Sequence, residues 1–153
     1  MNCHLPRRQL CLAVAAAFTA ALPLGPQCLV SQAHANPSAP IVNNGSASFH
    51  TQGKTLTVTN TPGAIINWQS FSISAGETTR FQQQSAASTV LNRVRGQDPS
   101  LILGTLSSNG RVFLINANGI VFGAGSRVDT QGLIASTLNI SDADFKKGVL
   151  KFN

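Results

Sequence analysis

Few side chains in this sequence could perform catalysis, and they do not form pairs. After residue 35 the only histidine is His50, and there is no cysteine. The acidic residues are Glu77, Asp98, Asp129, Asp142 and Asp144. A Ser-His-Asp triad or a zinc site would therefore depend on His50 alone. We expect no catalytic residue, no metal site and no cofactor, and we place His50 on the surface or in a turn.

Only Asp142 and Asp144 lie close together in the sequence. β-Helical enzymes that cleave polysaccharides use clustered carboxylates, so this pair is the one candidate. Together with Ser141, however, these residues have the form of a helix capping box, and Gly148 could end the short helix that follows. The sequence therefore predicts a helical turn here, as a cap or an insertion, in place of an acid pair.

Asparagine and glycine dominate the most informative stretch, residues 116–125, which reads Asn-Ala-Asn-Gly-Ile-Val-Phe-Gly-Ala-Gly. The pattern predicts a turn, a strand and a second turn. Asn118 and Gly119 can adopt left-handed backbone conformations at low cost, and asparagine side chains can bond to nearby main-chain groups. We expect such bonds to hold a corner between two coils of the chain.

The elements that carry these residues are expected to be short strands. Residues 55–59 alternate strictly, which places Leu56 and Val58 on one face and three threonines on the other. Residues 71–74 repeat the alternation. Between the two segments, Pro62 and Gly63 predict a bend.

Apolar runs recur at nearly even intervals in the second half of the chain. The runs are Val112–Ile115, Ile120–Phe122, Val128 and Leu133–Ala135, and their starts lie 8, 8 and 5 residues apart. Three such strands make a unit of about twenty residues, the size of one coil of a solenoid. A β-sandwich also uses short strands, but the very short strands and the Asn- and Gly-rich turns favour the solenoid.

The first 35 residues have the pattern of a cleavable signal peptide. Arg7 and Arg8 precede an apolar run over Leu10–Leu24, whose fifteen residues are fewer than a bilayer span requires. Ala33-His34-Ala35 is a small-x-small cleavage site, so cleavage after Ala35 would make Asn36 the first residue. All three cysteines lie within this leader.

Residues 36–153 carry a mild positive charge. Two of the eleven Lys and Arg residues lie in the leader, so nine remain against five acids. These basic residues are scattered through the segment, and no basic stripe or nucleic-acid-binding motif accompanies them. The distribution indicates a solvated surface and argues against a nucleic-acid partner.

A family resemblance is carried by several blocks of this sequence. Residues 116–120, Asn-Ala-Asn-Gly-Ile, resemble the Asn-Pro-Asn-Gly-Ile hallmark of the amino-terminal secretion domain in the filamentous haemagglutinin and haemolysin family, the exoproteins of bacterial two-partner secretion. Further blocks similar to the family stand in family order at residues 63–71, 90–94, 102–104 and 132–137. Ala117 stands where the family usually has Pro, so φ is not fixed at that position.

The resemblance implies an all-β fold, an incomplete right-handed single-stranded parallel β-helix over residues 36–153. It implies an exported, adhesin- or haemagglutinin-like exoprotein, of which this sequence is the first part, secreted or held at the cell surface. Its partners would be signal peptidase and the general export machinery, an outer-membrane β-barrel transporter with periplasmic recognition domains, and host-cell or surface glycans. Two alternatives stay open: a β-helical polysaccharide-active enzyme and a free-standing structural adhesive module.

Six residues form the candidate site under this resemblance. They either help the transporter to recognise the chain or serve turns and buried main-chain bonds, and both roles could hold together. The six are Asn92, Arg93, Asn116, Asn118, Gly119 and Ile120.

Overall fold

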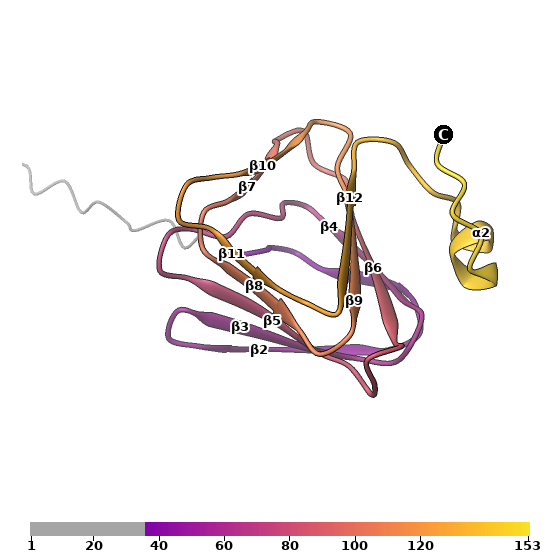
Figure 1. Ribbon diagram of the computed structural model, residues 1–153, viewed down its shortest axis with the longest axis horizontal. Helices are drawn as coiled ribbons and strands as arrows, with labels where there is room; N and C mark the ends of the chain where they lie inside the picture. The colour runs from indigo at the N-terminus through magenta and orange to yellow at the C-terminus, as the bar shows by residue number, and fades with distance from the viewer. Residues whose placement is uncertain (1–35) are drawn as a thin grey trace, which may run out of the picture. The chain divides into compact units, whose positions relative to one another are not determined.

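The computed structural model describes residues 36–153, which form twelve short strands and one short helix (Figure 1). The expected signal peptide at residues 1–35, with its cleavage residue Ala35, lies outside the described residues. The elements are β1 (Ile41–Asn44), β2 (Ala47–Gln52), β3 (Thr55–Asn60), β4 (Ala64–Trp68), β5 (Thr78–Gln82), β6 (Thr89–Val94), β7 (Ser100–Ile102), β8 (Thr105–Ser108), β9 (Arg111–Ile115), β10 (Ile120–Phe122), β11 (Arg127–Asp129), β12 (Gly132–Ser136) and α2 (Asp142–Lys147).

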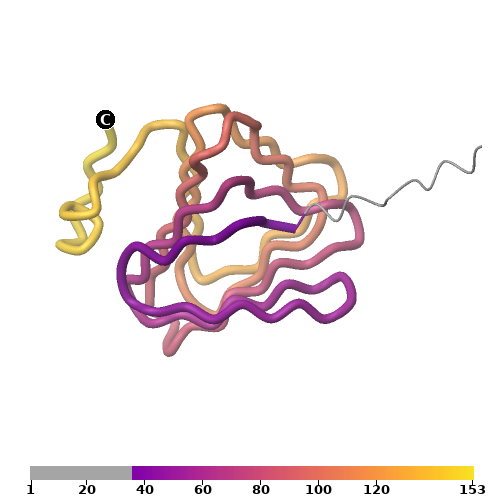
Figure 2. Tube along the Cα trace, turned by 180° about the vertical axis from the view of Figure 1, so that it is seen from behind, coloured from indigo at the N-terminus to yellow at the C-terminus, as the bar shows by residue number. Residues whose placement is uncertain are grey.

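Stacked coils of the chain place three sheets around a common interior (Figures 1 and 2). β3, β5, β8 and β11 pair in parallel on one side, β4, β6, β9 and β12 on the second, and β7 and β10 on the third. Residues one coil apart lie side by side: Thr105 pairs with Arg127, 22 positions later, and Ser100 with Ile120, 20 positions later. The predicted parallel β-helix is confirmed, and its last coil has the predicted length of about twenty residues. The earlier coils are longer, since Ala64 pairs with Val90, 26 positions later.

The first two strands depart from this parallel pattern. β1 pairs with β4 and β2 with β3, both antiparallel. β2 and β3 form a hairpin in which Gln52 faces Thr55 across the two-residue turn Gly53-Lys54. Glycine at the first position of a two-residue turn is a known hairpin pattern, so the sequence contained a signal for this element. β1 and β2 thus form the outer edge of the first coil.

The alternation of residues 71–74 predicted a strand, and that strand is absent. Phe71 and Ile73 are buried as the alternation requires, but only Ile73 makes a β-bridge, to Ile102 in β7. The segment occupies the third side of the first coil, where its neighbour β7 is only three residues long. The buried face was therefore predicted correctly and the strand was not.

Apolar side chains fill the interior of the coils. Leu56 and Val58 of β3 are buried, as their alternation predicts. Three aromatic rings pack in a row: Trp68 lies edge-on to Phe71 of the same coil with ring centres 5.6 Å apart, and Phe71 stacks on Phe81 of the next coil at 6.4 Å. Such offset and edge-to-face contacts add to the burial of the rings.

α2 lies on the outside of the second sheet, and its sequence prediction is confirmed. Ser141 caps the helix by accepting a hydrogen bond from the Asp144 amide, and Gly148 ends it with φ of 70°. Phe145 packs against Phe113 of β9, with ring centres 5.2 Å apart. Among the described residues, no helix is long and apolar enough to cross a membrane.

Candidate functional site

Asn116 organises a corner that joins two coils. It follows β9, is fully buried, and its Nδ2 donates to the Asp98 carbonyl and to Ser100 Oγ of the preceding coil, both at 3.0 Å. Its Oδ1 accepts a hydrogen bond from the main-chain amide of Asn118 at 3.0 Å. One side chain therefore closes its own turn and ties that turn to the coil below, as we expected of an asparagine at this position.

Asn118 and Gly119 complete this corner. Asn118 Nδ2 donates to the Gly96 carbonyl at 2.8 Å, which is a second side-chain link to the preceding coil. Gly119 has φ of 108°, and its carbonyl accepts a hydrogen bond from the Ser100 amide at 2.9 Å. Of these two residues, which can both adopt left-handed conformations at low cost, Gly119 has a positive φ and Asn118 a negative one. The contribution of Asn118 to the corner is instead the side-chain bond to the main chain of the preceding coil.

The corner also has an outer surface. Ile120 is half-buried against the core, whereas Ala117 and Asn118 are exposed. Residues 117–118 thus form the solvent-facing part of the motif, and Asn116 forms its buried support.

Asn92 lies elsewhere, inside the coils. It belongs to strand β6 and not to a turn, and it is fully buried. Its Oδ1 accepts a hydrogen bond from Trp68 Nε1 at 2.9 Å, and its Nδ2 donates to the Phe113 carbonyl at 3.3 Å. This amide accepts a hydrogen bond from the buried indole N–H of Trp68 and links β6 to the main chain of β9, as a buried polar side chain requires.

Arg93 points to the opposite side of the same strand, because successive residues of a strand face opposite ways. Its Nε donates to Asn139 Oδ1 at 2.9 Å, and its Nη2 donates to the Ile140 carbonyl at 2.7 Å and to Asp142 Oδ1 at 2.8 Å. The Arg93 side chain is 8% exposed and that of Asp142 is 40% exposed. Asn139 and Asp142 were not predicted as site residues, although a single arginine within the apolar run of β6 indicates that a partner must exist.

The structure therefore divides the six predicted residues between two places. Asn116, Asn118, Gly119 and Ile120 share the corner, while Asn92 and Arg93 lie on the two faces of β6. Asn92 bonds to Trp68 and Phe113 in the interior, and Arg93 holds the segment that contains Asn139 and Asp142. Both residues depend on partners far away in the sequence.

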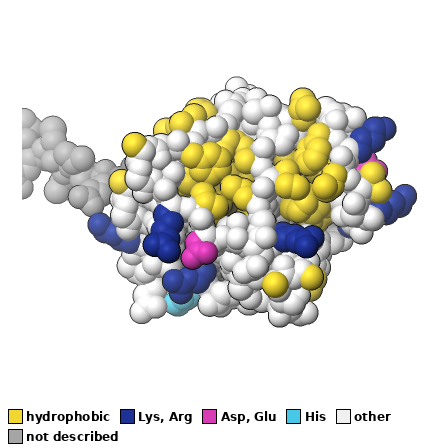
Figure 3. Space-filling model, in the orientation of Figure 1, with side chains coloured by type: hydrophobic (Ala, Val, Ile, Leu, Met, Phe, Trp, Pro, Cys, Tyr) yellow, Lys and Arg dark blue, Asp and Glu magenta, His cyan; other side chains and the backbone are white. Residues whose placement is uncertain are grey.

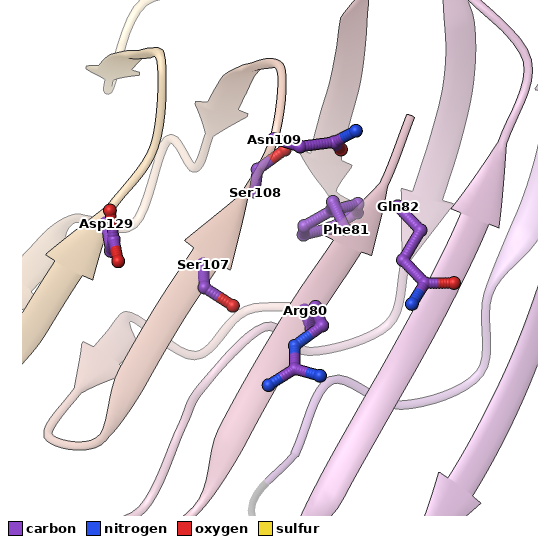
Figure 4. Close-up of a pocket in the computed structure, with 7 residues that line it drawn as sticks. All are labelled: Arg80, Phe81, Gln82, Ser107, Ser108, Asn109 and Asp129. Atoms are coloured by element: carbon purple, nitrogen blue, oxygen red, sulfur yellow. The ribbon is translucent and has the colours of Figure 1, made fainter. Parts of the chain in front are cut away.

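A polar hollow of about 560 Å³ lies on the outer side of β5, β8 and β11 (Figure 4). Arg80, Ser107 and Asp129 line it, and Asp129 makes an exposed ion pair with Arg127 at 3.9 Å. A polysaccharide-cleaving site requires two carboxyl groups on either side of the bond, and this hollow is lined by one. Within residues 36–153, no group of three or more His, Cys, Asp or Glu side chains is placed to hold a metal ion.

Comparisons with known proteins agree with this architecture. The family described as TPS secretion domain matches residues 31–152. Two heme/hemopexin-binding proteins of Haemophilus influenzae are 37% identical over 97 residues and 36% identical over 77 residues. These alignments cover 63% and 50% of this chain but 11% and 8% of the relatives, so the chain spans about a tenth of their length.

A solved structure is also similar to this chain. The HMW1 secretion domain from Haemophilus influenzae aligns with a TM-score of 0.73 and 39% sequence identity. The alignment covers 74% of this chain and 30% of that one. The stacked coils described above are thus shared with an experimentally determined secretion domain.

Proposed function

The chain belongs to the family of TPS secretion domains, and from this premise we propose that residues 36–153 direct export through a partner transporter in the outer membrane. Members of this family are the secretion domains of exported two-partner secretion exoproteins. The observation that carries the proposal is the family match over residues 31–152. The partner would be a β-barrel transporter whose periplasmic domains recognise this domain.

The stacked coils suggest how folding assists export. Each coil pairs its main chain with the coil before it, so a folded coil presents free amides and carbonyls to the next. A chain that emerges from the transporter unfolded would add coil after coil on the outside. Each added coil would then disfavour backward movement, without any nucleotide being consumed. Residues 36–153 contain no cysteine, so no disulfide can close a loop too wide to pass.

We place recognition on the exposed part of the corner, Ala117 and Asn118. Both are exposed, whereas Asn92 and Arg93 are buried and engaged with other parts of the domain. A transporter that recognises these two residues before the coils form would therefore bind side chains that the folded core does not bury.

The test places the same bulky charge at two corners of one coil. Ala117→Arg adds it to the recognition corner, and Ala124→Arg adds it to the next corner, where Ala124 is also exposed. With the cognate transporter co-expressed, we expect Ala117→Arg to lower the secreted fraction roughly tenfold, as expected for a central interface contact. We expect Ala124→Arg to secrete normally, and both purified variants to unfold at the denaturant concentration of the wild type. Normal secretion of both variants would show that the transporter does not recognise the chain at this corner.

The leader and the final location are part of the same proposal. Signal peptidase would remove residues 1–35 after Ala35, and the general export machinery would deliver the chain to the periplasm. Asn36 would then be the first residue, and its Oδ1 accepts a hydrogen bond from Thr79 Oγ1 at 3.2 Å. The exported product would be secreted or held at the outer membrane, where host-cell or surface glycans would be its adhesive ligands.

A further inference from the structure

Residues 139–153, which we call the strap, form a closed loop on the outside of the second sheet. Asn139 and Asn153 exchange main-chain hydrogen bonds of 3.1 and 2.8 Å at the base of the loop, and α2 lies between them. Within the described residues, the main-chain hydrogen bonds of the strap all join two residues of the strap itself. No ladder of main-chain bonds therefore extends from the coils into this loop.

The strap is attached through side chains. Arg93 is its polar attachment, with one bond to each of Asn139, Ile140 and Asp142. Its apolar attachment is a buried cluster in which Ile140 and Phe145 of the strap pack against the sheet. The sheet contributes Ile65, Leu91, Phe113 and Ile115 to that cluster.

The buried sheet residues of this cluster come from three different coils, and Ile134 of β12, in the next coil, packs against the cluster while partly exposed. Ile65 of β4 pairs with Leu91 of β6, and Leu91 pairs with Phe113 of β9, so these side chains form one column across the stack. Arg93 stands in the adjacent column, next to Ile115. A shift of one residue in any coil would turn its side chain to the other face and remove the column.

We propose that the strap is a detachable closure that locks the first three coils in register, and that Arg93 is the residue that fastens it. The surface to which it binds exists only when three coils are stacked correctly, so the strap closes after them. It opens as a unit, because opening breaks only the three Arg93 bonds and the apolar contacts and leaves the ladders of the coils intact. Opening exposes the column of Ile65, Leu91 and Phe113 to solvent.

Hydrogen exchange at single amides tests this proposal in the folded protein. The strap reporters are the amides of Phe145, Gly148 and Val149, which are bonded within the strap. The coil reporters are the amides of β6 and β9. In Arg93→Ala we expect strap amides to exchange at least about tenfold faster, because the bonds lost include two to charged or buried groups. The coil amides should keep their wild-type rates within about twofold.

Three further variants make the result specific. Arg93→Lys keeps the charge but loses the fork that reaches three acceptors, so its strap amides should exchange at an intermediate rate. Asp142→Ala removes only the half-exposed partner, so its effect should be smaller than that of Arg93→Ala and confined to the strap. Arg95→Ala is the matched control, since Arg95 is exposed in the same segment, and its exchange rates should be those of the wild type.

Two outcomes would overturn the proposal. Equal acceleration of strap and coil amides would show that the strap does not open separately, and unchanged strap amides in Arg93→Ala would show that Arg93 does not fasten it. If Arg93→Ala fails to fold, the comparison of strap with coil amides in Asp142→Ala gives the same decision. Exchange of the wild type in rising urea is an independent measurement, in which strap amides should open at lower urea than coil amides.

Discussion

Neighbouring residues of this chain have opposite environments, and Asn92 and Arg93 show why the sequence could not separate them. Alternation places Asn92 on the face of Val90 and Val94, and Arg93 on the face of Leu91. When one side of a strand faces solvent, the polar residues on that side show which face of the strand points outward. Here the coil interior covers one face and the strap covers the other, so both faces of β6 are apolar and the pattern gives no direction.

Replacing Asn92 with alanine tests its role as a buried hydrogen-bonding partner. We expect Asn92→Ala to lower the free energy of unfolding by about 2 kcal/mol, because the Trp68 indole N–H loses its partner inside the core and the side-chain bond to the Phe113 carbonyl is lost. Urea unfolding followed by fluorescence would measure this change, since Trp68 is the only tryptophan.

Asn43→Ala is the control for this measurement, because Asn43 is exposed in β1. Its effect on the free energy of unfolding should stay within about 0.5 kcal/mol. Equal effects of the two substitutions would contradict the assigned role of Asn92.

At the scale of elements, prediction succeeded where an element depends on its own sequence. β10 has the predicted bounds, β9 and β12 extend the predicted runs by one residue or two, and the Ser141 cap and Gly148 stop of α2 are as expected. The antiparallel pairing of β1 with β4 was missed, because it depends on which strands meet in space. The pairing of β2 with β3 was also missed, although Gly53 in the two-residue turn is a hairpin signal. The corner was predicted from Asn116 to Gly119, but its anchor points at Gly96 and Ser100 are set by the stacking of the coils.

Gly104 marks a place where one coil approaches the backbone of another closely. A Cβ at this position would overlap the carbonyl oxygens of Ser74 and Glu77 in the preceding coil. We expect Gly104→Ala to lower the free energy of unfolding by about 1–3 kcal/mol, because main chain cannot move aside as a flexible side chain can. Urea unfolding measures this loss.

Gly132→Ala provides the comparison for Gly104→Ala. Gly132 begins β12, and the nearest atom to its added Cβ would be Arg111 Cγ, at an ordinary contact distance of 3.4 Å. This substitution should change the free energy of unfolding by no more than about 0.5 kcal/mol. A loss as large as that of Gly104→Ala would mean that close approach is not the cause.

At the scale of the whole described domain, the two ends of the stack differ. The first coil carries β1 and β2 at its edge, whereas the last strands, β10, β11 and β12, leave inward-facing side chains uncovered. Phe122 and Val128 pair in register with the fully buried Ile102 and Leu106, yet they are 41% and 40% exposed. Figure 3 shows hydrophobic side chains gathered in two areas of the face that it presents.

This uncovered end combines apolar side chains with the free main-chain edges of β11 and β12, and such an edge is a template for pairing with another chain. We therefore expect a protein consisting of residues 36–153 to associate as its concentration rises, and Phe122→Ser with Val128→Thr to shift that association to concentrations at least several-fold higher. Sedimentation velocity across a concentration series measures the effect.

Leu101→Ser is the matched control for this measurement. Leu101 is 42% exposed, and it points outward from β7 because the side chain of its neighbour Ile102 faces the interior. If Leu101→Ser reduces association as strongly as the double substitution, the contact lies on the side of the coils and not at their uncovered end.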